Sequence, residues 1–252
     1  MHIDLSGKSI LVTGASRGIG AAIARGMAHA GGRVAIHFNN SVSVAESLAK
    51  EIGNSSQAFK ANLADSTETT LLFQQVKEAF GQIDVLVNNA GIAISSPVKS
   101  AEQTWLEDWN KTIDVNLSAS ALLCKLAIGH FQEGQGGTII NISSRAAFRG
   151  DTEDYLAYAA SKGGMVALTR SIARAFGKDG ILAYNVAPGF TRTAMAQDFI
   201  DQYGEDYAVN DIALQQLTEP SDIAPTVVFL ASGLAKHATG ATIDINAGSY
   251  VH

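Results

Sequence analysis

A tyrosine and a lysine stand four residues apart, Tyr158 and Lys162, in a segment of helical character. Positions i and i+4 share one face of a helix. A tyrosine hydroxyl has an ordinary pKa of about 10, and a nearby ammonium group favours the phenolate and lowers that value. The pair could therefore exchange a proton with an alcohol or a ketone near neutral pH. A solvent-exposed helical pair without chemistry is the alternative, and the spacing alone leaves it open.

Two further polar residues fit the same chemistry. Ser144 follows an apolar run, and a hydroxyl at that place could hydrogen-bond a substrate oxygen as negative charge develops on it. Ser143 competes for this role, and a turn would explain either serine alone. Asn116 lies inside an expected helix, where asparagine is unusual, and a local backbone bond or kink is its alternative explanation.

A glycine-rich stretch, 13–20, contains Gly14, Gly18 and Gly20 after an expected strand. A pyrophosphate approaching the backbone needs residues without a β-carbon, and a helix N-terminus offers it free N–H groups and partial positive charge. The spacing is G-x-x-x-G-x-G, which differs from the broader G-x-G-x-x-G dinucleotide motif. A tight turn without a ligand is the alternative for this stretch taken alone.

Short apolar runs alternate with helix-length segments along the whole chain, beginning with a helix expected over 18–30. This order predicts an α/β fold: a single doubly wound Rossmann-type domain over residues 1–252, with a seven-stranded parallel sheet and helices on both faces. Ligands of such sheets bind at the carboxyl ends of the strands, where each of the motifs above falls. The expected strands are 9–13, 33–38, 57–60, 83–87, 137–142, 181–186 and 241–245.

Composition excludes several classes of function. The chain is 46% hydrophobic, carries a formal net charge of -6 and has one cysteine, Cys124. The negative charge argues against a nucleic-acid partner, and the single cysteine fits a reducing compartment. No signal-like N-terminus and no apolar run of membrane-spanning length stands out. We therefore expect a cytoplasmic protein that binds neither a membrane nor a metal.

Taken together, these motifs and Asn88-Asn89-Ala90-Gly91 and Pro188-Gly189 resemble the short-chain dehydrogenase/reductase family over essentially all 252 residues. The resemblance implies that Tyr158 is the acid/base and that Ser144 polarises the carbonyl. Lys162 would lower the pKa of the tyrosine and hold the nicotinamide ribose. Asn116 would hold a water that links Lys162 to solvent. Hydride transfer itself would belong to a nicotinamide cofactor.

The resemblance also implies which residues hold that cofactor. Two departures from the family pattern stand out: Ser144 and Tyr158 are 14 residues apart where 13 is usual, and Asn62 replaces a common aspartate. An amide oxygen can accept the same adenine hydrogen bond as a carboxylate. The implied cofactor residues are Gly14, Ser16, Arg17, Gly18, Ile19, Gly20, Asn39, Asn40, Ser41, Asn62, Leu63, Asn89, Ala90, Gly91, Tyr158, Lys162, Pro188, Gly189, Thr191 and Thr193.

The end of the second expected strand favours NADP(H) over NAD(H). An NAD-binding enzyme typically places a carboxylate there for the adenosine ribose. In this chain, the first acidic residue after the strand is Glu46. Arg17 in the glycine-rich stretch could instead bind a 2′-phosphate with charge-assisted hydrogen bonds. His37 could contribute only if protonated, and we expect it to be a strand residue without that role.

Substrate specificity is expected in a lid over about 190–217. Its apolar and aromatic residues are Phe190, Met195, Phe199, Tyr203 and Tyr207, and its acidic residues are Asp198, Asp201, Glu205, Asp206 and Asp211, with Arg192 as the only basic residue. The acidic residues would disfavour a highly anionic substrate. Packing of the lid on its own domain is an equal alternative for the apolar set.

The 3-oxoacyl-carrier-protein reductases are the most similar subgroup, which predicts a carrier-bound 3-oxoacyl thioester as the substrate. Arg174 matches one basic residue expected to dock the acidic carrier, whereas Gly129 replaces another. A dehydrogenase of a small polyol, sugar or xenobiotic ketone is the first alternative. A catalytically idle nucleotide-sensing scaffold is the second, and the intact set of catalytic residues argues against it.

We also expect a homotetramer. In the resembled family, a long helix, here about 115–131, and the helix beginning near Tyr158 pair across a two-fold axis, and closed two-fold symmetry is usual for such surfaces. The tail 249–252 could add a second contact. Small and apolar residues that would permit close helix approach are Gly163, Gly164, Met165, Ala121, Leu122 and Ala127.

Overall fold

The computed structural model describes residues 3–204 and 209–251, apart from the side chains of residues 198, 199 and 201–203. Seven parallel strands form one sheet in the order β3-β2-β1-β4-β5-β6-β7. The order reverses between β1 and β4, and this reversal is where doubly wound sheets bind their ligands. The strands are β1 (Ser9–Val12), β2 (Arg33–Phe38), β3 (Gln57–Lys60), β4 (Val85–Asn88), β5 (Gly137–Ile142), β6 (Ile181–Pro188) and β7 (Thr242–Ile245).

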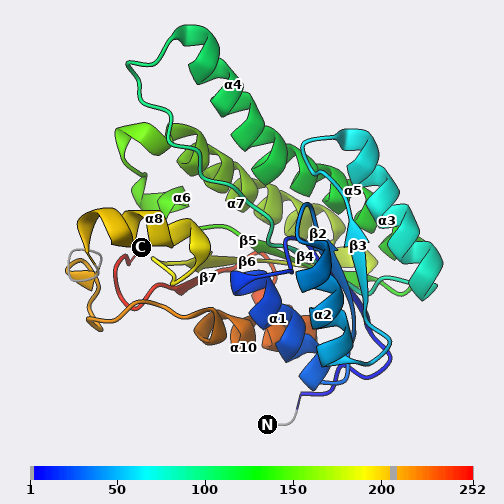
Figure 1. Cartoon of the computed structure of the whole chain (residues 1–252). Helices are drawn as coiled ribbons and strands as arrows, with labels where there is room; N and C mark the ends of the chain where they lie inside the picture. The colour runs from blue at the N-terminus through cyan, green and yellow to red at the C-terminus, as the bar shows by residue number, and fades with distance from the viewer. Residues whose placement is uncertain (1–2, 205–208, 252) are drawn as a thin grey trace.

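Helices cover both faces of this sheet (Figure 1). α1 (Gly18–His29), α2 (Val42–Ile52) and α10 (Pro220–Ala231) pack on one face. α3 (Ser66–Phe80), α5 (Ala119–Glu133) and α7 (Leu156–Phe176) pack on the other. The other α-helices in the described part of the chain are α4 (Glu102–Ile113), α6 (Ala146–Arg149) and α8 (Ala194–Tyr203). The predicted fold class, a doubly wound α/β sheet of seven parallel strands, is confirmed.

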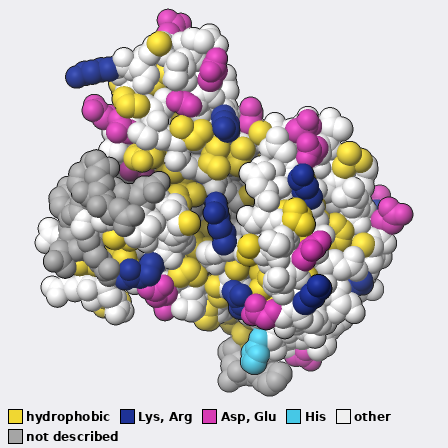
Figure 2. Space-filling view, in the orientation of Figure 1, with side chains coloured by type: hydrophobic (Ala, Val, Ile, Leu, Met, Phe, Trp, Pro, Cys, Tyr) yellow, Lys and Arg dark blue, Asp and Glu magenta, His cyan; other side chains and the backbone are white. Residues whose placement is uncertain are grey.

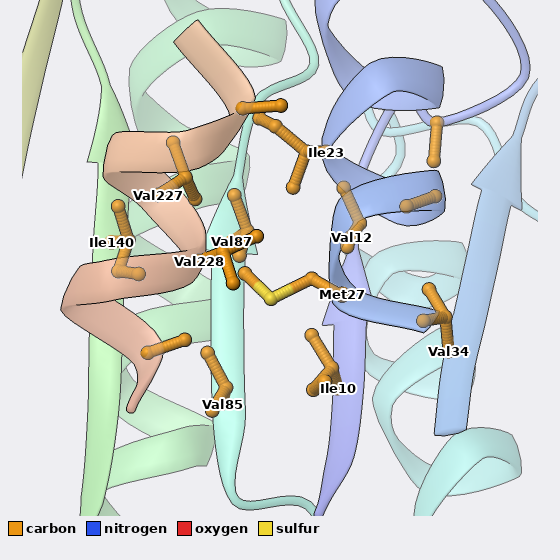
Figure 3. Packing of buried hydrophobic residues seen from close by; sticks show 14 of the residues in the cluster. Ile10, Val12, Ile23, Met27, Val34, Val85, Val87, Ile140, Val227 and Val228 are labelled. Atoms are coloured by element: carbon orange, nitrogen blue, oxygen red, sulfur yellow. The ribbon is translucent and has the colours of Figure 1, made fainter. Parts of the chain in front are cut away.

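The core explains why these segments take these positions. Strands of β-branched residues buried on both faces suit a parallel sheet, and β1 and β4 are buried at all four positions. Figure 3 shows Ile23 and Met27 of α1 and Val227 and Val228 of α10 meeting above the inner strands. Gly26 lets the two helices approach, because a β-carbon there would lie 3.0 Å from Cγ2 of Val228.

Several expected boundaries differ from the structure. β4 starts at Val85 rather than at 83, and β6 continues to Pro188, two residues beyond the expected end. The helix expected over 115–131 is part of a longer one. α4, a π-helical turn at Asp114–Ser118 and α5 form a continuous helix over 102–133. The start of this helix was not predicted, because residues 102–111 are mostly polar and the helix has no side-chain N-cap.

This long helix is apolar and long enough to cross a membrane by length and composition alone. In the structure its inner face packs against α3, β4, β5 and α7, as a core helix does. The N-terminal end of the helix carries a stacked pair of tryptophans, Trp105 and Trp109, with ring centroids 5.2 Å apart. α4 projects from the body of the molecule (Figure 1).

The expected lid contains α8 and a small apolar cluster of its own. Ile212 and Leu217 are buried together, with Phe190, Ile200 and Val209 packed around them. Met195 is half exposed. The expectations for the side chains of Phe199, Tyr203, Asp198 and Asp201, and for Glu205, Asp206 and Tyr207, lie outside the described residues.

Candidate active site

Tyr158 and Lys162 lie in the first turns of α7, below the carboxyl end of β5. Lys162 is 3% exposed, and its Nζ donates a hydrogen bond to the carbonyl oxygen of Ile142 at 2.9 Å. The same nitrogen lies 5.7 Å from the ring centroid of Tyr158. Burial lowers the pKa of Lys162 to about 8. A desolvated lysine therefore stands directly beside the tyrosine ring.

Ser144, not Ser143, faces the tyrosine hydroxyl. Ser144 hydrogen-bonds Tyr158, and its Oγ also accepts from the backbone N–H of Ala146 at 3.1 Å. Ser143 is turned inward, where its Oγ accepts from Asn185 at 2.6 Å and donates to the carbonyl oxygen of Val186. The unusual spacing of 14 residues is accommodated by the short helix α6 and a 3-10 turn at Glu153–Tyr155.

The pKa of Tyr158 differs from the sequence-based expectation. Burial raises it above the ordinary value, the hydrogen bond with Ser144 lowers it, and the carboxylate of Asp151 raises it. The net direction is therefore upward, whereas the neighbouring Lys162 was expected to bring it down. Desolvation of the phenolate is the larger effect at this partly buried position.

Asn116 lies in the π-helical turn and is fully buried. Its Oδ1 accepts from the backbone N–H of Ile92 at 2.8 Å, and its Nδ2 donates to the carbonyl oxygen of Ile92 at 2.9 Å and to Ser161 Oγ at 3.1 Å. Ser161 in turn donates to the carbonyl oxygen of Tyr158 at 2.7 Å. π-helical turns often mark functional sites, and this one joins the loop after β4 to α7.

Gly91 brings the loop after β4 close to these side chains. A β-carbon on Gly91 would lie 3.3 Å from Lys162 Nζ and 3.4 Å from Asn116 Oδ1. The four expected catalytic residues, Asn116, Ser144, Tyr158 and Lys162, are thus brought together at one edge of the sheet. Their arrangement can deliver a proton to an oxygen held between Ser144 and Tyr158.

The glycine loop adopts the conformation that a close backbone approach requires. Gly14 and Gly18 have φ values of 61° and 56°, which side chains disfavour. A β-carbon on Gly20 would lie 2.4 Å from the carbonyl oxygen of Gly14 and 2.5 Å from Asn89 Nδ2. Gly20 therefore lets α1 begin directly against the loop after β4.

Thr13 and His37 fix this loop from two sides. Thr13 Oγ1 accepts from the backbone N–H groups of Asn89 and Ala90 at 2.9 and 3.0 Å. His37 Nδ1 accepts from the backbone N–H of Gly14 at 3.0 Å, and its Nε2 lies 3.0 Å from the carbonyl oxygen of Ala61. Burial lowers the pKa of His37 to about 4, so its ring is neutral.

The other expected cofactor residues lie along the same edge. Ser16 and Ile19 are half-buried beside the exposed Arg17, and Asn39, Asn40 and Ser41 follow β2 at the surface. Ala15 donates to the carbonyl oxygen of His37, which sets the loop beside the end of β2. A β-carbon on Gly18 would lie 3.4 Å from the methyl group of Thr193, so the segment after β6 reaches the glycine loop.

Three of the expected cofactor residues make side-chain hydrogen bonds to backbone atoms of their own loops. The Oδ1 of Asn62 already accepts from the backbone N–H of Ala64 at 3.1 Å, next to the buried Leu63. The hydroxyl of Thr191 donates to the carbonyl oxygen of Gly189, and that of Thr193 donates to the carbonyl oxygen of Thr191. Pro188 ends β6 beside them.

Sequence reasoning missed several residues that hold the site. Thr13, Ser161 and Asn141 were given no role, and His37 was set aside. Asn141 accepts from Asn88 at 2.8 Å and donates to Thr169 at 2.8 Å, which ties β4 and β5 to α7. Thr13 and Ser161 each adjoin a quoted motif, and that adjacency is the signal that could have found them.

The surface over this edge is mixed in character. On the face drawn in Figure 2, hydrophobic side chains gather in the centre below the projecting α4, and Lys or Arg side chains are scattered among Asp and Glu. The described residues include no group of three or more His, Cys, Asp or Glu placed to hold a metal ion.

Comparison with known proteins agrees with this architecture. A family model described as enoyl-(acyl carrier protein) reductase matches residues 14–250. The 3-oxoacyl-(acyl-carrier-protein) reductase of Staphylococcus aureus is 38% identical over 247 residues, covering 97% of this chain and 98% of that protein. D-threitol dehydrogenase of Mycolicibacterium smegmatis is 36% identical, covering 97% of this chain and 93% of that protein.

Solved structures give the same result. The crystal structure of a dehydrogenase/reductase from Sinorhizobium meliloti has a TM-score of 0.91 at 34% identity, covering 99% of this chain and 98% of that chain. The chain belongs to the short-chain dehydrogenase/reductase family. It is an oxidoreductase that interconverts ketones and secondary alcohols with a nicotinamide cofactor.

Proposed function

We propose that this enzyme reduces 3-oxoacyl thioesters with NADPH, using Tyr158 as the proton donor. The observation that carries the chemistry is the convergence of Ser144, Tyr158 and Lys162 at the carboxyl edge of β5. Ser144 and Tyr158 hold the ketone oxygen, and Tyr158 protonates it as the alcohol forms. Lys162 supplies positive charge beside the tyrosine and binds the nicotinamide ribose. Asn116 holds the loop after β4 in place and supports a water relay to Lys162.

The bound cofactor supplies the hydride, and the glycine loop would hold its pyrophosphate. Gly14, Gly18 and Gly20 leave the space that a diphosphate needs, next to the N-terminus of α1. Asn89, Ala90 and Gly91 would border the adenosine ribose, Asn62 and Leu63 the adenine, and Pro188, Gly189, Thr191 and Thr193 the nicotinamide and pyrophosphate.

The preference for NADPH over NADH rests on charge. The segment after β2 presents Asn39, Asn40 and Ser41 without a carboxylate, and the exposed Arg17 stands three residues after Gly14. Arg17 makes no ion pair with the described carboxylates, so its guanidinium is available for a 2′-phosphate. One such charge-assisted contact is worth roughly tenfold to a hundredfold in selectivity.

The cofactor assignment is tested by measuring kcat/KM with NADPH and NADH for the wild type and for Arg17→Ala. The wild type should prefer NADPH, and the substitution should remove most of the preference. Arg25→Ala is the matched control, because Arg25 lies on the helix that Arg17 caps but pairs with Glu51 at 2.6 Å. A wild-type preference for NADH, or equal effects of both substitutions, contradicts the assignment.

An acidic carrier protein has a basic surface to dock on. Arg170 and Arg174 lie one turn apart on α7 and line a surface hollow of about 570 Å³ together with Ser171 and Ala175. Gly129 on α5 adds no charge. The relatives named 3-oxoacyl-(acyl-carrier-protein) reductase also favour a carrier-bound substrate.

The substrate assignment is tested with 3-oxobutyryl groups on acyl carrier protein and on N-acetylcysteamine, a small neutral thiol. Arg170→Ala and Arg174→Ala should raise KM for the carrier-bound substrate and leave the small thioester unaffected. Failure of the wild type to reduce either thioester would contradict the proposal. The similarity to D-threitol dehydrogenase supports a second candidate, the oxidation of a small polyol, and D-threitol with NADP+ is its assay.

We further infer a cytoplasmic homotetramer that pairs the 102–133 helix and α7 across a two-fold axis. The expected interface residues need revision, because Ala127 and Met165 are fully buried in their own chain and Gly164 packs against Leu117. The half-exposed Leu122 and the Trp105–Trp109 pair are better candidates. A monomer in light scattering at micromolar concentration would contradict this assembly.

A further inference from the structure

Arg145 is the residue immediately after Ser144, and its backbone lies between two parts of the active-site edge. Its N–H donates to the carbonyl oxygen of Pro188 at 3.0 Å. This bond joins the end of β5 to the end of β6, so the side chain starts from the rim where the substrate oxygen and the nicotinamide must meet.

The guanidinium of Arg145 is buried and incompletely satisfied. The side chain is 16% exposed, and its Nη1 has no hydrogen-bond partner among the described residues. Among the described carboxylates, Asp211 forms an ion pair with Nη1 through its Oδ2 at 3.7 Å, which is beyond hydrogen-bond length. That oxygen already accepts from Arg149 Nη1 at 2.6 Å. Buried N–H groups without an acceptor are uncommon and costly, so such a group needs an explanation.

The chain places this guanidinium in the neighbourhood of the reacting group, because Arg145 directly follows Ser144, whose hydroxyl hydrogen-bonds Tyr158. The carboxylate of Asp151 raises the pKa of Tyr158 and also favours the charged form of Arg145. Burial and the positive charge of Arg149 lower the pKa of Arg145, and the carboxylates of Asp211 and Asp151 offset only part of this effect. The ion pair with Asp211 at 3.7 Å therefore compensates only part of the cost of burying the charge.

We propose that Arg145 Nη1 binds a second oxygen of the substrate, two carbons from the reacting ketone, and so selects β-dicarbonyl compounds. The acceptor is the thioester carbonyl oxygen of a 3-oxoacyl thioester or the carboxylate of a 3-oxo acid. This inference rests on the proposed reduction of a 3-oxoacyl group. Ser144 and Tyr158 hold one oxygen and Arg145 holds the other, which fixes the carbon between them and orients the ketone toward the cofactor.

Arg149 has a different part in this cluster. It is more exposed than Arg145, and its short bond to Asp211 ties α6 to the end of the expected lid. Substituting Arg149 removes the neighbouring positive charge and leaves Arg145 itself in the chain. Arg149 is therefore a matched control: it carries the same charge, ends the short helix that Arg145 caps and pairs with the same carboxylate.

The experiment compares three ketones in the wild type, Arg145→Met and Arg149→Met. They are the N-acetylcysteamine thioester of 3-oxobutyrate, 3-oxobutyrate itself and an alkyl methyl ketone of similar length without a second oxygen. The measured quantity is the ratio of kcat/KM for each β-dicarbonyl substrate to kcat/KM for the plain ketone. Because both values come from one preparation, the ratio is independent of the folded fraction.

Arg145→Met should lower this ratio by roughly tenfold to a hundredfold, and Arg149→Met should leave it within about threefold of the wild type. A selective loss with the thioester or with the free acid identifies which oxygen is bound. An unchanged ratio in Arg145→Met, or an equal fall in Arg149→Met, overturns the inference. Wild-type reduction of the acid but not of the thioester would refute the proposed thioester function while leaving the role of Arg145 testable with the acid.

Discussion

The backbone N–H of Gly14 donates a hydrogen bond to Nδ1 of His37 at 3.0 Å, and this bond ties the glycine loop to the second strand. Because Nδ1 is the acceptor, the ring proton resides on Nε2, which donates to the carbonyl oxygen of Ala61 at 3.0 Å. One buried imidazole thus links the loops after β1 and β3. Only the neutral ring can make both bonds, since a protonated ring has no acceptor.

The neutral state of His37 predicts a specific loss of stability in acid. Its pKa is about 4 in the folded protein and about 6.5 when unfolded, so the unfolded chain binds the proton more readily between these values. The contribution of His37 to the free energy of unfolding is fully present above pH 6.5. It falls by ~3 kcal/mol as the pH drops toward 4. His37→Gln removes this contribution. Measured by urea unfolding, the difference in free energy of unfolding between wild type and variant should shrink over that window; a constant difference would show that His37 does not titrate there.

Tyr158→Phe should abolish proton transfer and preserve the fold. The hydroxyl is the group that faces Ser144, and general acid catalysis contributes roughly a hundredfold to ten-thousandfold. We expect kcat to fall in that range while the Kd for the nucleotide stays near the wild-type value. Tyr184→Phe is the control, since its hydroxyl bonds Ala235 on the far side of β6. Wild-type turnover in Tyr158→Phe would disprove its role as acid/base.

Lys162 should control the alkaline limb of the pH–rate profile. Its pKa is about 8, so the ammonium is present below that pH and is lost above it. Burial raises the pKa of Tyr158 above 10, so a limb near pH 8 belongs to the lysine. In the reduction direction, kcat/KM should fall as the pH rises through about 8. Lys162→Arg keeps the charge and should move the limb to higher pH, whatever its absolute activity; an unmoved limb would refute the assignment.

Two glycines provide a matched pair for testing the packing. Gly20→Ala places a methyl group within 2.5 Å of Gly14 and Asn89 atoms, which should cost about 1–3 kcal/mol and weaken nucleotide binding. Gly129→Ala meets nothing within 4 Å in the exposed part of α5 and should stabilise the protein by about 0.5–1 kcal/mol. Thermal unfolding and nucleotide titration measure both. A tolerated Gly20→Ala would contradict the close approach of α1 to the loop after β4.

Local patterns in the sequence were sufficient to predict the parallel sheet and the edge of the sheet at which the site lies. Strand alternation predicted seven parallel strands, and the motifs after β1, β4, β5 and β6 predicted which edge carries the chemistry. The choice of Ser144 over Ser143 came from the family resemblance alone, because the residues themselves do not show which way the chain turns after β5. The pKa of Tyr158 was out of reach, since burial depends on the whole fold.

Contacts between distant segments explain the other differences. Arg145, Arg149 and Asp211 meet across more than 60 residues, and nothing in their local sequence predicts it. Ala127 and Met165 were expected at the interface between subunits, because composition shows that a helix is apolar but not which stripe of it faces its own sheet. The π-helical turn at Asn116 rotates that stripe further, because each such turn inserts an extra residue into the helical period.

The position of Cys124 makes the core of this enzyme measurable without any introduced label. It is the one cysteine in the sequence, and it lies fully buried between α5 and the sheet, beside Asn88 and Asn141. Burial raises the pKa of its thiol to about 12, so the native state offers an alkylating reagent almost no thiolate. Modification therefore requires a local opening that separates α5 from the strands. The rate of thiol modification therefore measures how often α5 opens. The decrease of that rate on adding nucleotide measures how strongly cofactor binding is coupled to this opening.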